Sequence, residues 1–184
     1  MIIQLNVLGS FIFFITGLLL LIFFIRLIIF FFKKNRFPKK LLIASLVGIG
    51  MFFCIFVYLN YFFTFDQLIG ETFKEPVSSP TKKYTANAYL QNYGGAVGGV
   101  KIWVNITNHE DNDQIKTVYY GEASSNFFMY WIDEETISIS HESSNHIDAE
   151  DSIELDVSTD IYDETGIACT SLLMKDEYEN CYQN

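Results

Sequence analysis

The segment Asn92–Lys101, NYGGAVGGVK, combines four glycines with a lysine, as loops that bind phosphate do. A phosphate-binding loop has the pattern G-x-x-x-x-G-K-[ST] between a strand and a helix, where backbone N–H groups and the lysine surround the phosphates. Gly94 and Gly99 have the correct separation, but Val100 intervenes before Lys101 and a strand-like run follows. The sequence therefore predicts a glycine-rich hairpin connection here and no cofactor site.

Histidines supply two further candidate sites. In HESSNH, His141 and His146 are five residues apart, whereas the H-E-x-x-H pattern places two histidines four apart so that both face one zinc ion. HEDNDQ, residues 109–114, has oxygen ligands for calcium but lacks the glycine and the distal glutamate of a calcium loop. We predict solvated turns for both segments, with weak calcium binding as the alternative for the second. No metal and no catalytic residue are predicted.

The charged residues divide the chain into two unlike parts. All 22 acidic residues lie at Asp66 or later, together with six lysines, which gives this part a net charge of −16. The earlier part has six basic residues and no acidic one, and the whole chain has a net charge of −10. An asymmetry of this kind indicates a membrane-inserted part joined to a water-soluble part. The acidic part favours cationic partners and argues against nucleic acid.

Residues 11–32 and 41–65 are apolar stretches that are long enough to cross a bilayer, which requires about 20 residues. The loop between them, residues 33–40, contains five basic residues: Lys33, Lys34, Arg36, Lys39 and Lys40. Because basic residues beside membrane spans remain in the cytoplasm, they are the topology signal. The sequence predicts a helical hairpin in the plasma membrane, with the N-terminus and the C-terminal part both outside the cell.

Small residues in the second span allow close packing of helices. Ala44 and Gly48 are four residues apart, as in helix pairs whose backbones approach closely in membranes. This spacing fits packing within the hairpin and packing in a homo-oligomer equally well.

The exterior part begins with a predicted juxtamembrane linker, residues 66–75, and continues as a domain over residues 76–184. Short runs with alternating apolar and polar residues predict antiparallel strands at 83–90, 100–107, 114–120, 126–132, 135–140 and 152–157. The predicted fold class is a transmembrane α-helical hairpin followed by a small mainly-β exterior domain, an antiparallel sheet or sandwich, with a short C-terminal helical tail.

Two cysteines lie outside the predicted spans, Cys169 and Cys181. The exterior of the cell permits disulfides. In one unbroken helix, residues twelve apart would be about 18 Å apart, which exceeds the reach of a disulfide. We therefore predict a Cys169–Cys181 disulfide that requires the tail to fold back after a short helix.

Several segments of the exterior part resemble one family of proteins. They are SPTKKYTANAYLQNYGGAVGGVKIWV, KTVYY, WIDEETISI and the tail YDETGIACTSLLMKDEYENCYQN. In these segments the chain resembles an uncharacterised family of small membrane-anchored proteins from low-GC Gram-positive bacteria, catalogued as a domain of unknown function. The resemblance implies no activity and no site residue.

Three functions remain as hypotheses. The favoured one is a membrane-anchored cell-surface interaction or sensing module, without a catalytic site, that binds an extracytoplasmic protein, peptide or wall component. The second is an accessory or immunity-type membrane subunit whose helices contact a membrane protein partner. The third and least favoured is a hydrolase that uses His109, His141, His146 and acidic loops. The lipid bilayer is a predicted partner under all three hypotheses.

Overall fold

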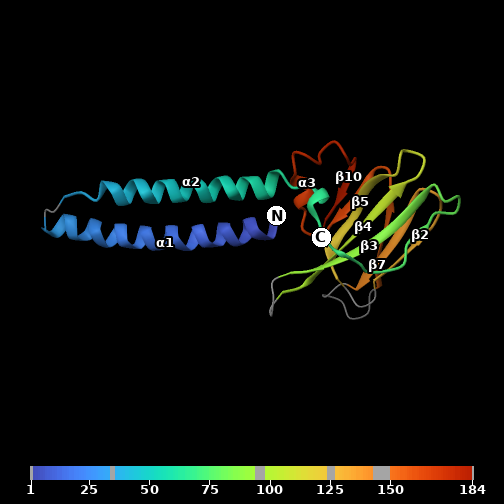
Figure 1. Cartoon of the computed structure of the whole chain (residues 1–184), viewed down its shortest axis with the longest axis horizontal. Helices are drawn as coiled ribbons and strands as arrows, with labels where there is room; N and C mark the ends of the chain where they lie inside the picture. The colour runs from blue at the N-terminus through green and yellow to red at the C-terminus, as the bar shows by residue number, and fades with distance from the viewer. Residues whose placement is uncertain (1, 34–35, 94–97, 124–126, 143–149, 184) are drawn as a thin grey trace. The chain divides into compact units, whose positions relative to one another are not determined.

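The computed structural model describes residues 2–33, 36–93, 98–123, 127–142 and 150–183 of the 184-residue chain. The chain divides into two compact units, Met1–Phe62 and Phe63–Asn184. The first unit consists of two long helices and the second is mainly β (Figure 1). This confirms the predicted fold class.

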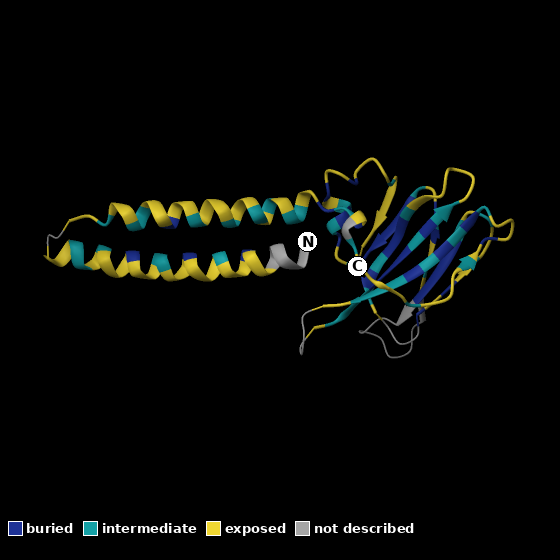
Figure 2. Cartoon of the chain, in the orientation of Figure 1, coloured by how far each residue is buried: buried dark blue, intermediate teal, exposed yellow. Residues whose placement is uncertain are grey.

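The helical unit contains α1 (Ile2–Lys33) and α2 (Lys39–Tyr61). Both helices are long and apolar enough to cross a bilayer, over Val7–Lys33 and Lys39–Tyr61. Most of their large apolar side chains are exposed (Figure 2). Because lipid accepts such side chains and a helix satisfies its own backbone hydrogen bonds, the two helices indicate membrane association.

The helices differ in extent from the predicted spans. α1 begins well before residue 11, because the polar residues near the N-terminus interrupt an apolar run without ending a helix. α2 ends at Tyr61 rather than at residue 65, because Phe63 and Phe65 are buried in the second unit. Apolar composition alone does not distinguish a phenylalanine that faces lipid from one that faces a protein core.

Small and polar residues line the contact between α1 and α2. Thr16 and Ser45 are buried, and a Cβ added at Gly48 would lie 2.4 Å from Thr16 Oγ1. The Ser45 hydroxyl donates to the carbonyl of Leu41 in its own helix at 2.9 Å, so it does not tie the helices together. Gly48 therefore packs within the hairpin, whereas Ala44 is exposed.

The described part of the second unit forms ten strands and two short helices. The strands are β1 (Glu71–Thr72), β2 (Val77–Ser78), β3 (Tyr84–Asn92), β4 (Val100–Asn108), β5 (Gln114–Glu122), β6 (Phe128–Trp131), β7 (Thr136–Glu142), β8 (Glu150–Asp156), β9 (Asp160–Asp163) and β10 (Asn180–Tyr182). The helices are the 3₁₀ helix η1 (Phe65–Gln67) and α3 (Ile167–Thr170).

The strands form two sheets. The larger sheet has the order β1-β3-β4-β5-β9-β10, with β2 also paired to β3, and the smaller has the order β6-β7-β8. All pairs are antiparallel except β5–β9 and β9–β10, which are parallel. All six strands predicted from alternation are present.

The core of the second unit contains residues of both sheets. Its fully buried members include Ala86, Ile102 and Val104 from the larger sheet and Ile137 and Ile139 from the smaller. Figure 2 shows the buried residues alternating with less buried ones along the strands, because successive side chains of a strand point to opposite faces. The predicted inward faces of 100–107 and 135–140 are confirmed at these positions.

Trp103 lies on the predicted outer face of β4 yet is buried. The ring of Tyr89 stacks on it at 5.8 Å. The chain before β1 covers it as well, since a Cβ added at Gly70 would lie 2.2 Å from Trp103 Cη2. Residues 66–75, predicted as a linker, therefore belong to the folded unit, and β1 pairs with β3.

The C-terminal tail also differs in detail from the prediction. Its helix, α3, ends at Thr170, the first residue of the segment TSLLMKDEYEN, and does not continue through that segment. The chain then returns as β10, which pairs in parallel with β9. A three-residue strand whose partner lies far back in the sequence has no local pattern that could predict it.

Candidate functional site

A groove of about 690 Å³ lies in the second unit. Its lining comes from the chain around η1, from β4 and β5, from the turn after β8 and from the tail after α3. Charged, polar and aromatic side chains are mixed in it, including Phe65, Asp66, Trp103, Asn105, Lys116, Thr117, Ser158, Met174, Asp176, Glu177 and Tyr178. A mixture of this kind fits binding pockets, in which a few polar groups orient a ligand against apolar walls.

A β-bulge shapes the floor of the groove. Val104 pairs with Tyr119 and Asn105 pairs with Thr117, so Val118 is the extra residue on β5. The Thr117 hydroxyl donates to Asn105 Oδ1 at 2.8 Å, and the Tyr178 hydroxyl donates to the Thr117 carbonyl at 2.6 Å. Bulges interrupt regular pairing and occur often beside functional sites. Here the bulge coincides with the place where the tail attaches to the sheet.

Lys116 is a half-buried cation of the groove. Its Nζ donates to the carbonyl of Ser158 and lies 4.6 Å from the centre of the Tyr178 ring. Burial lowers its pKa, although Glu177, Asp156 and other nearby carboxylates act in the opposite direction. The ammonium is therefore already held by a carbonyl and an aromatic face.

Two carboxylates of the groove are close enough to influence each other. Burial raises the pKa of Glu177, and the nearby charge of Asp66 raises it further, whereas the charge of Lys116 acts in the opposite direction. Neither carboxylate forms an ion pair with any of the described residues. The groove therefore holds negative charge that its own lysine does not neutralise by direct contact.

The disulfide predicted between Cys169 and Cys181 is present in the structure, with a Cα–Cα distance of 5.6 Å. It closes a loop that contains Met174, Asp176, Glu177 and Tyr178, which form one wall of the groove. No local pattern of the sequence predicts the groove. The sequence signal that points to it is an acidic run, KDEYE, which lies between the two cysteines and so in a constrained loop.

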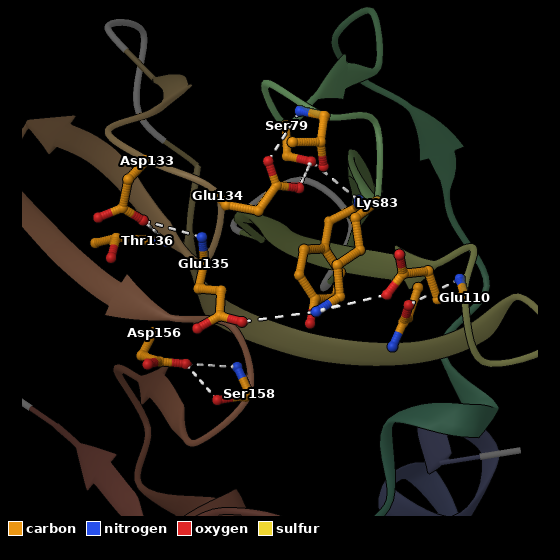
Figure 3. A network of polar contacts seen from close by, with 12 residues as sticks. Ser79, Lys83, Glu110, Asp133, Glu134, Glu135, Thr136, Asp156 and Ser158 are labelled. Carbon is orange, nitrogen blue, oxygen red and sulfur yellow. Dashed lines mark hydrogen bonds and ion pairs between the residues drawn. The ribbon is translucent and has the colours of Figure 1, made fainter.

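The acidic segment WIDEET has a structural role in the described structure (Figure 3). Glu134 accepts hydrogen bonds from the Ser79 hydroxyl at 2.6 Å and the Thr81 N–H at 2.8 Å. Asp133 accepts bonds from the backbone of its own turn, which lower its pKa. Glu135 forms an ion pair with Lys83 at 3.6 Å. These carboxylates connect the turn before β7 to the segment between β2 and β3.

His109 lies in a short relay of polar side chains. Its Nε2 is 2.9 Å from Thr85 Oγ1, and its Nδ1 is 2.6 Å from Asp113 Oδ1. With the proton on Nδ1, the histidine donates to Asp113 and accepts from Thr85, the order of a hydroxyl, base and carboxylate triad. The relay is not part of the groove lining, and the Asp113 side chain is 71% exposed, so water screens its charge.

The remaining candidates do not form a site in the described structure. Strand pairing of Asn92 with Val100 makes the glycine-rich segment a connection between antiparallel strands, although residues 94–97 lie outside the described residues. His146 and Lys34, one of the residues of the topology signal, also lie outside the described residues. The other four basic residues lie at the ends of α1 and α2 and in the chain between them. No group of three metal-ligating side chains occurs among the residues that the structure describes.

Comparison with known proteins gives one match. The model of a family of unknown function, DUF5412, matches residues 38–165, which is more than half of the chain. No curated protein and no solved structure matches. The matched region includes α2 and the strands from β1 to β9, with the groove floor and the polar relay. The chain therefore belongs to DUF5412, a family of unknown function.

Proposed function

We propose that the chain is a membrane-anchored interaction or sensing module of the cell surface of a low-GC Gram-positive bacterium, without a catalytic role. The helical hairpin holds it in the plasma membrane with residues 33–40 in the cytoplasm. The N-terminus and the β unit are outside the cell. The partner is an extracytoplasmic protein or peptide with basic side chains, and nucleic acid is not bound.

The observation that carries the proposal is the groove, whose carboxylates Asp66 and Glu177 form no direct ion pair among the described residues. The acidic part of the chain has a net charge of −16, which attracts cations from a distance. Within the groove, Asp66 and Glu177 have no described ion-pair partner, and the rings of Phe65 and Trp103 line the same space. A lysine or arginine side chain has an apolar stem and a charged end that fit such a lining.

Binding of an oligolysine peptide to the full chain in detergent tests this function. The double variant Asp66→Asn/Glu177→Gln should bind the peptide about tenfold more weakly, which corresponds to about 1.4 kcal/mol. The matched control, Glu71→Gln/Glu75→Gln, removes the same charge from exposed positions outside the groove lining. Raising the salt concentration should weaken binding to the unmodified protein. Equal affinity of both double variants would contradict a role for the groove.

Cysteine labelling of intact cells tests the orientation. In a background with Cys54→Ala, a cysteine is introduced at Asn35 or at Ser124. A membrane-impermeant maleimide should label Ser124→Cys and leave Asn35→Cys unlabelled until the cells are permeabilised. The opposite pattern would place the β unit in the cytoplasm.

One observation favours a second function, a hydrolase. The relay Thr85–His109–Asp113 has hydrogen bonds in the order required to activate a hydroxyl nucleophile. A fluorophosphonate probe would then label the protein covalently, and Thr85→Val would abolish the labelling. We expect no labelling of the unmodified protein, because the relay is exposed and lies outside the groove.

A further inference from the structure

The loop closed by the disulfide exposes two neighbouring leucines. Leu172 and Leu173 are 61% and 54% exposed, whereas Ser171 and Met174 on either side are 1% and 3% exposed. Large apolar side chains are usually buried in a folded domain, and adjacent exposed ones form a patch that fits an apolar partner. The buried flanking residues show that the segment is packed, so the exposure of the leucines is a consequence of its fold.

Hydrogen bonds hold the leucine pair beside the first residue of the β unit. The Ser171 hydroxyl donates to the carbonyl of Phe63 at 2.7 Å and accepts the N–H of Leu173 at 3.3 Å. Ser171 and Phe63 are both buried, and the Cys169–Cys181 disulfide closes the loop that contains Ser171. The position of the leucines is therefore fixed relative to Phe63.

Chain connectivity places Phe63 close to the bilayer. α2 has 23 residues, a length of about 35 Å, which covers a hydrocarbon core of about 30 Å. Phe63 follows the last residue of α2, Tyr61, by two residues, so it lies within about 7 Å of the helix end. Tyr58 and Tyr61 are of the residue type that is enriched at the membrane–water interface. A segment bonded to Phe63 is therefore close to the head-group layer.

We propose that Leu172 and Leu173 insert into the exterior leaflet of the membrane and form a second, peripheral contact between the β unit and lipid. The inference rests on the proposed membrane hairpin. Lipid is the occupant that the connectivity favours, because the leucines are tied to a residue that emerges from the span. Met174 and Glu177 of the groove wall belong to the same closed loop, so this contact would restrain one wall of the groove.

Tryptophan quenching in vesicles tests the proposal with the full chain. Leu173→Trp is reconstituted into phosphatidylcholine vesicles with and without bromine on the upper acyl-chain carbons. The fluorescence added by this tryptophan, after subtraction of the native Trp103 and Trp131 signal, should be largely lost in brominated vesicles. Leu172→Trp, a second reporter at an exposed position, should behave in the same way.

Glu110→Trp is the matched control at the β4–β5 turn. The ring of Tyr120 on β5 is 6.1 Å from that of Phe63. The turn precedes Gln114, the first residue of β5 and six residues before Tyr120, so it lies about 20 Å from Tyr120 along the strand. Its fluorescence should be nearly the same in both vesicle types. Equal quenching of the Leu173→Trp and Glu110→Trp signals would overturn the proposal. A blue-shifted Leu173→Trp emission without quenching would overturn it too, since protein would then cover the patch.

An alkaline carbonate wash separates this proposal from the hairpin on which it rests. Retention of the protein in washed vesicles supports the membrane hairpin whatever the quenching result. Loss of the protein from the vesicles would overturn the hairpin and the leucine contact together. Binding of oligolysine in the groove is measured independently and does not enter either result.

Discussion

The helical unit and the β unit satisfy their backbone hydrogen bonds in different ways. Apolar side chains face outward in the helical unit and inward in the β unit. In α1 and α2 backbone hydrogen bonds are formed within each helix, and large apolar side chains face outward. In the β unit the backbone bonds join strands that are distant in sequence, and apolar side chains are enclosed between them. The first unit therefore depends on its surroundings, and the second depends on its own long-range contacts.

The same difference applies to charge. The charged residues of the helical unit are all basic, and five of the six lie at positions 33–40, between the end of α1 and the start of α2. In the β unit, several carboxylates accept hydrogen bonds from turns, such as Asp133, Glu134 and Asp163. The groove carboxylates Asp66 and Glu177 are different, because among the described residues neither a hydrogen bond from a turn nor a direct ion pair holds them. We therefore expect substitutions to have different consequences in the two units.

The largest contrast is expected for the same substitution at two isoleucines. Ile139→Ala should lower the free energy of unfolding of the β unit by about 2–5 kcal/mol, because Ile139 is fully buried and truncation leaves a cavity. Ile43→Ala removes a side chain that is 61% exposed on α2 and should cost less than about 1 kcal/mol. Denaturant unfolding of the full chain in detergent, followed by near-ultraviolet circular dichroism, measures the first. The far-ultraviolet signal, which reports helix, measures the second. Equal losses of unfolding free energy in the two variants would contradict the expected difference between the units.

Removal of the disulfide is expected to have the next largest effect. Cys169→Ala/Cys181→Ala opens a loop of about a dozen residues, for which the chain-entropy model gives about 3 kcal/mol. Hydrogen exchange should accelerate first in β10 and in the wall of the groove, because the other strands share a separate core. Cys54→Ala, in α2, is the control and should leave exchange unchanged. Free, alkylatable thiols at Cys169 and Cys181 in the unmodified protein would show that no bridge is formed in solution.

The contrast between the units also explains how much the sequence predicts. Hydrophobic length alone identifies the two helices, and short apolar-rich runs separated by polar clusters identify β3, β4, β5, β6, β7 and β8. Both signals are local. β1, β2, β9 and β10 have two to four residues each, too short for a periodic pattern. The predicted end of the second span, residue 65, is wrong for a related reason. Phe63 and Phe65 are as apolar as the residues of the span, so composition does not separate them from it.

The groove could not be predicted because its parts are distant in sequence. Asp66 follows the second helix, Asn105 and Thr117 lie on central strands, and Glu177 lies in the tail. The bulge at Val118, which lies beside Asn105 and Thr117, depends on the pairing of β4 with β5. The contact between Thr85 and His109 is unpredictable for the same reason, because the two residues are 24 positions apart in the sequence.

A smaller effect is expected within the helical unit. A Cβ at Gly48 would lie 2.4 Å from Thr16 Oγ1, whereas a Cβ at Gly50 would have no neighbour within 4 Å. Gly48→Leu should therefore separate α1 from α2 at a cost of about 1–3 kcal/mol, and Gly50→Leu is the matched control. The readout is cross-linking between Phe13→Cys and Phe52→Cys in a Cys54→Ala background, since these rings are 5.3 Å apart. Undiminished cross-linking in Gly48→Leu would contradict the packing.

The smallest effect on stability is expected at Glu177, where stability and binding should change in opposite directions. Its pKa is raised from 4.5 by burial and by Asp66, so the folded protein holds this proton more tightly than the unfolded chain. Stability therefore falls as the pH rises from 4.5 through the raised value, and the loss is complete above it. Glu177→Gln should recover about a few tenths of a kcal/mol at pH 7, because solvent screens a partly exposed pair. The gain should vanish below pH 4.5.

Glu75→Gln, at an exposed position outside the groove, is the control and should show no pH-dependent gain. The measurement is thermal unfolding at pH 7 and at pH 4 for the unmodified protein and both variants. If Glu177→Gln becomes more stable and also binds oligolysine more weakly, the groove retains a carboxylate that costs stability because it serves binding. If it becomes less stable at pH 7, Glu177 has a partner that holds the charged form, and the groove has no uncompensated charge to offer a cation.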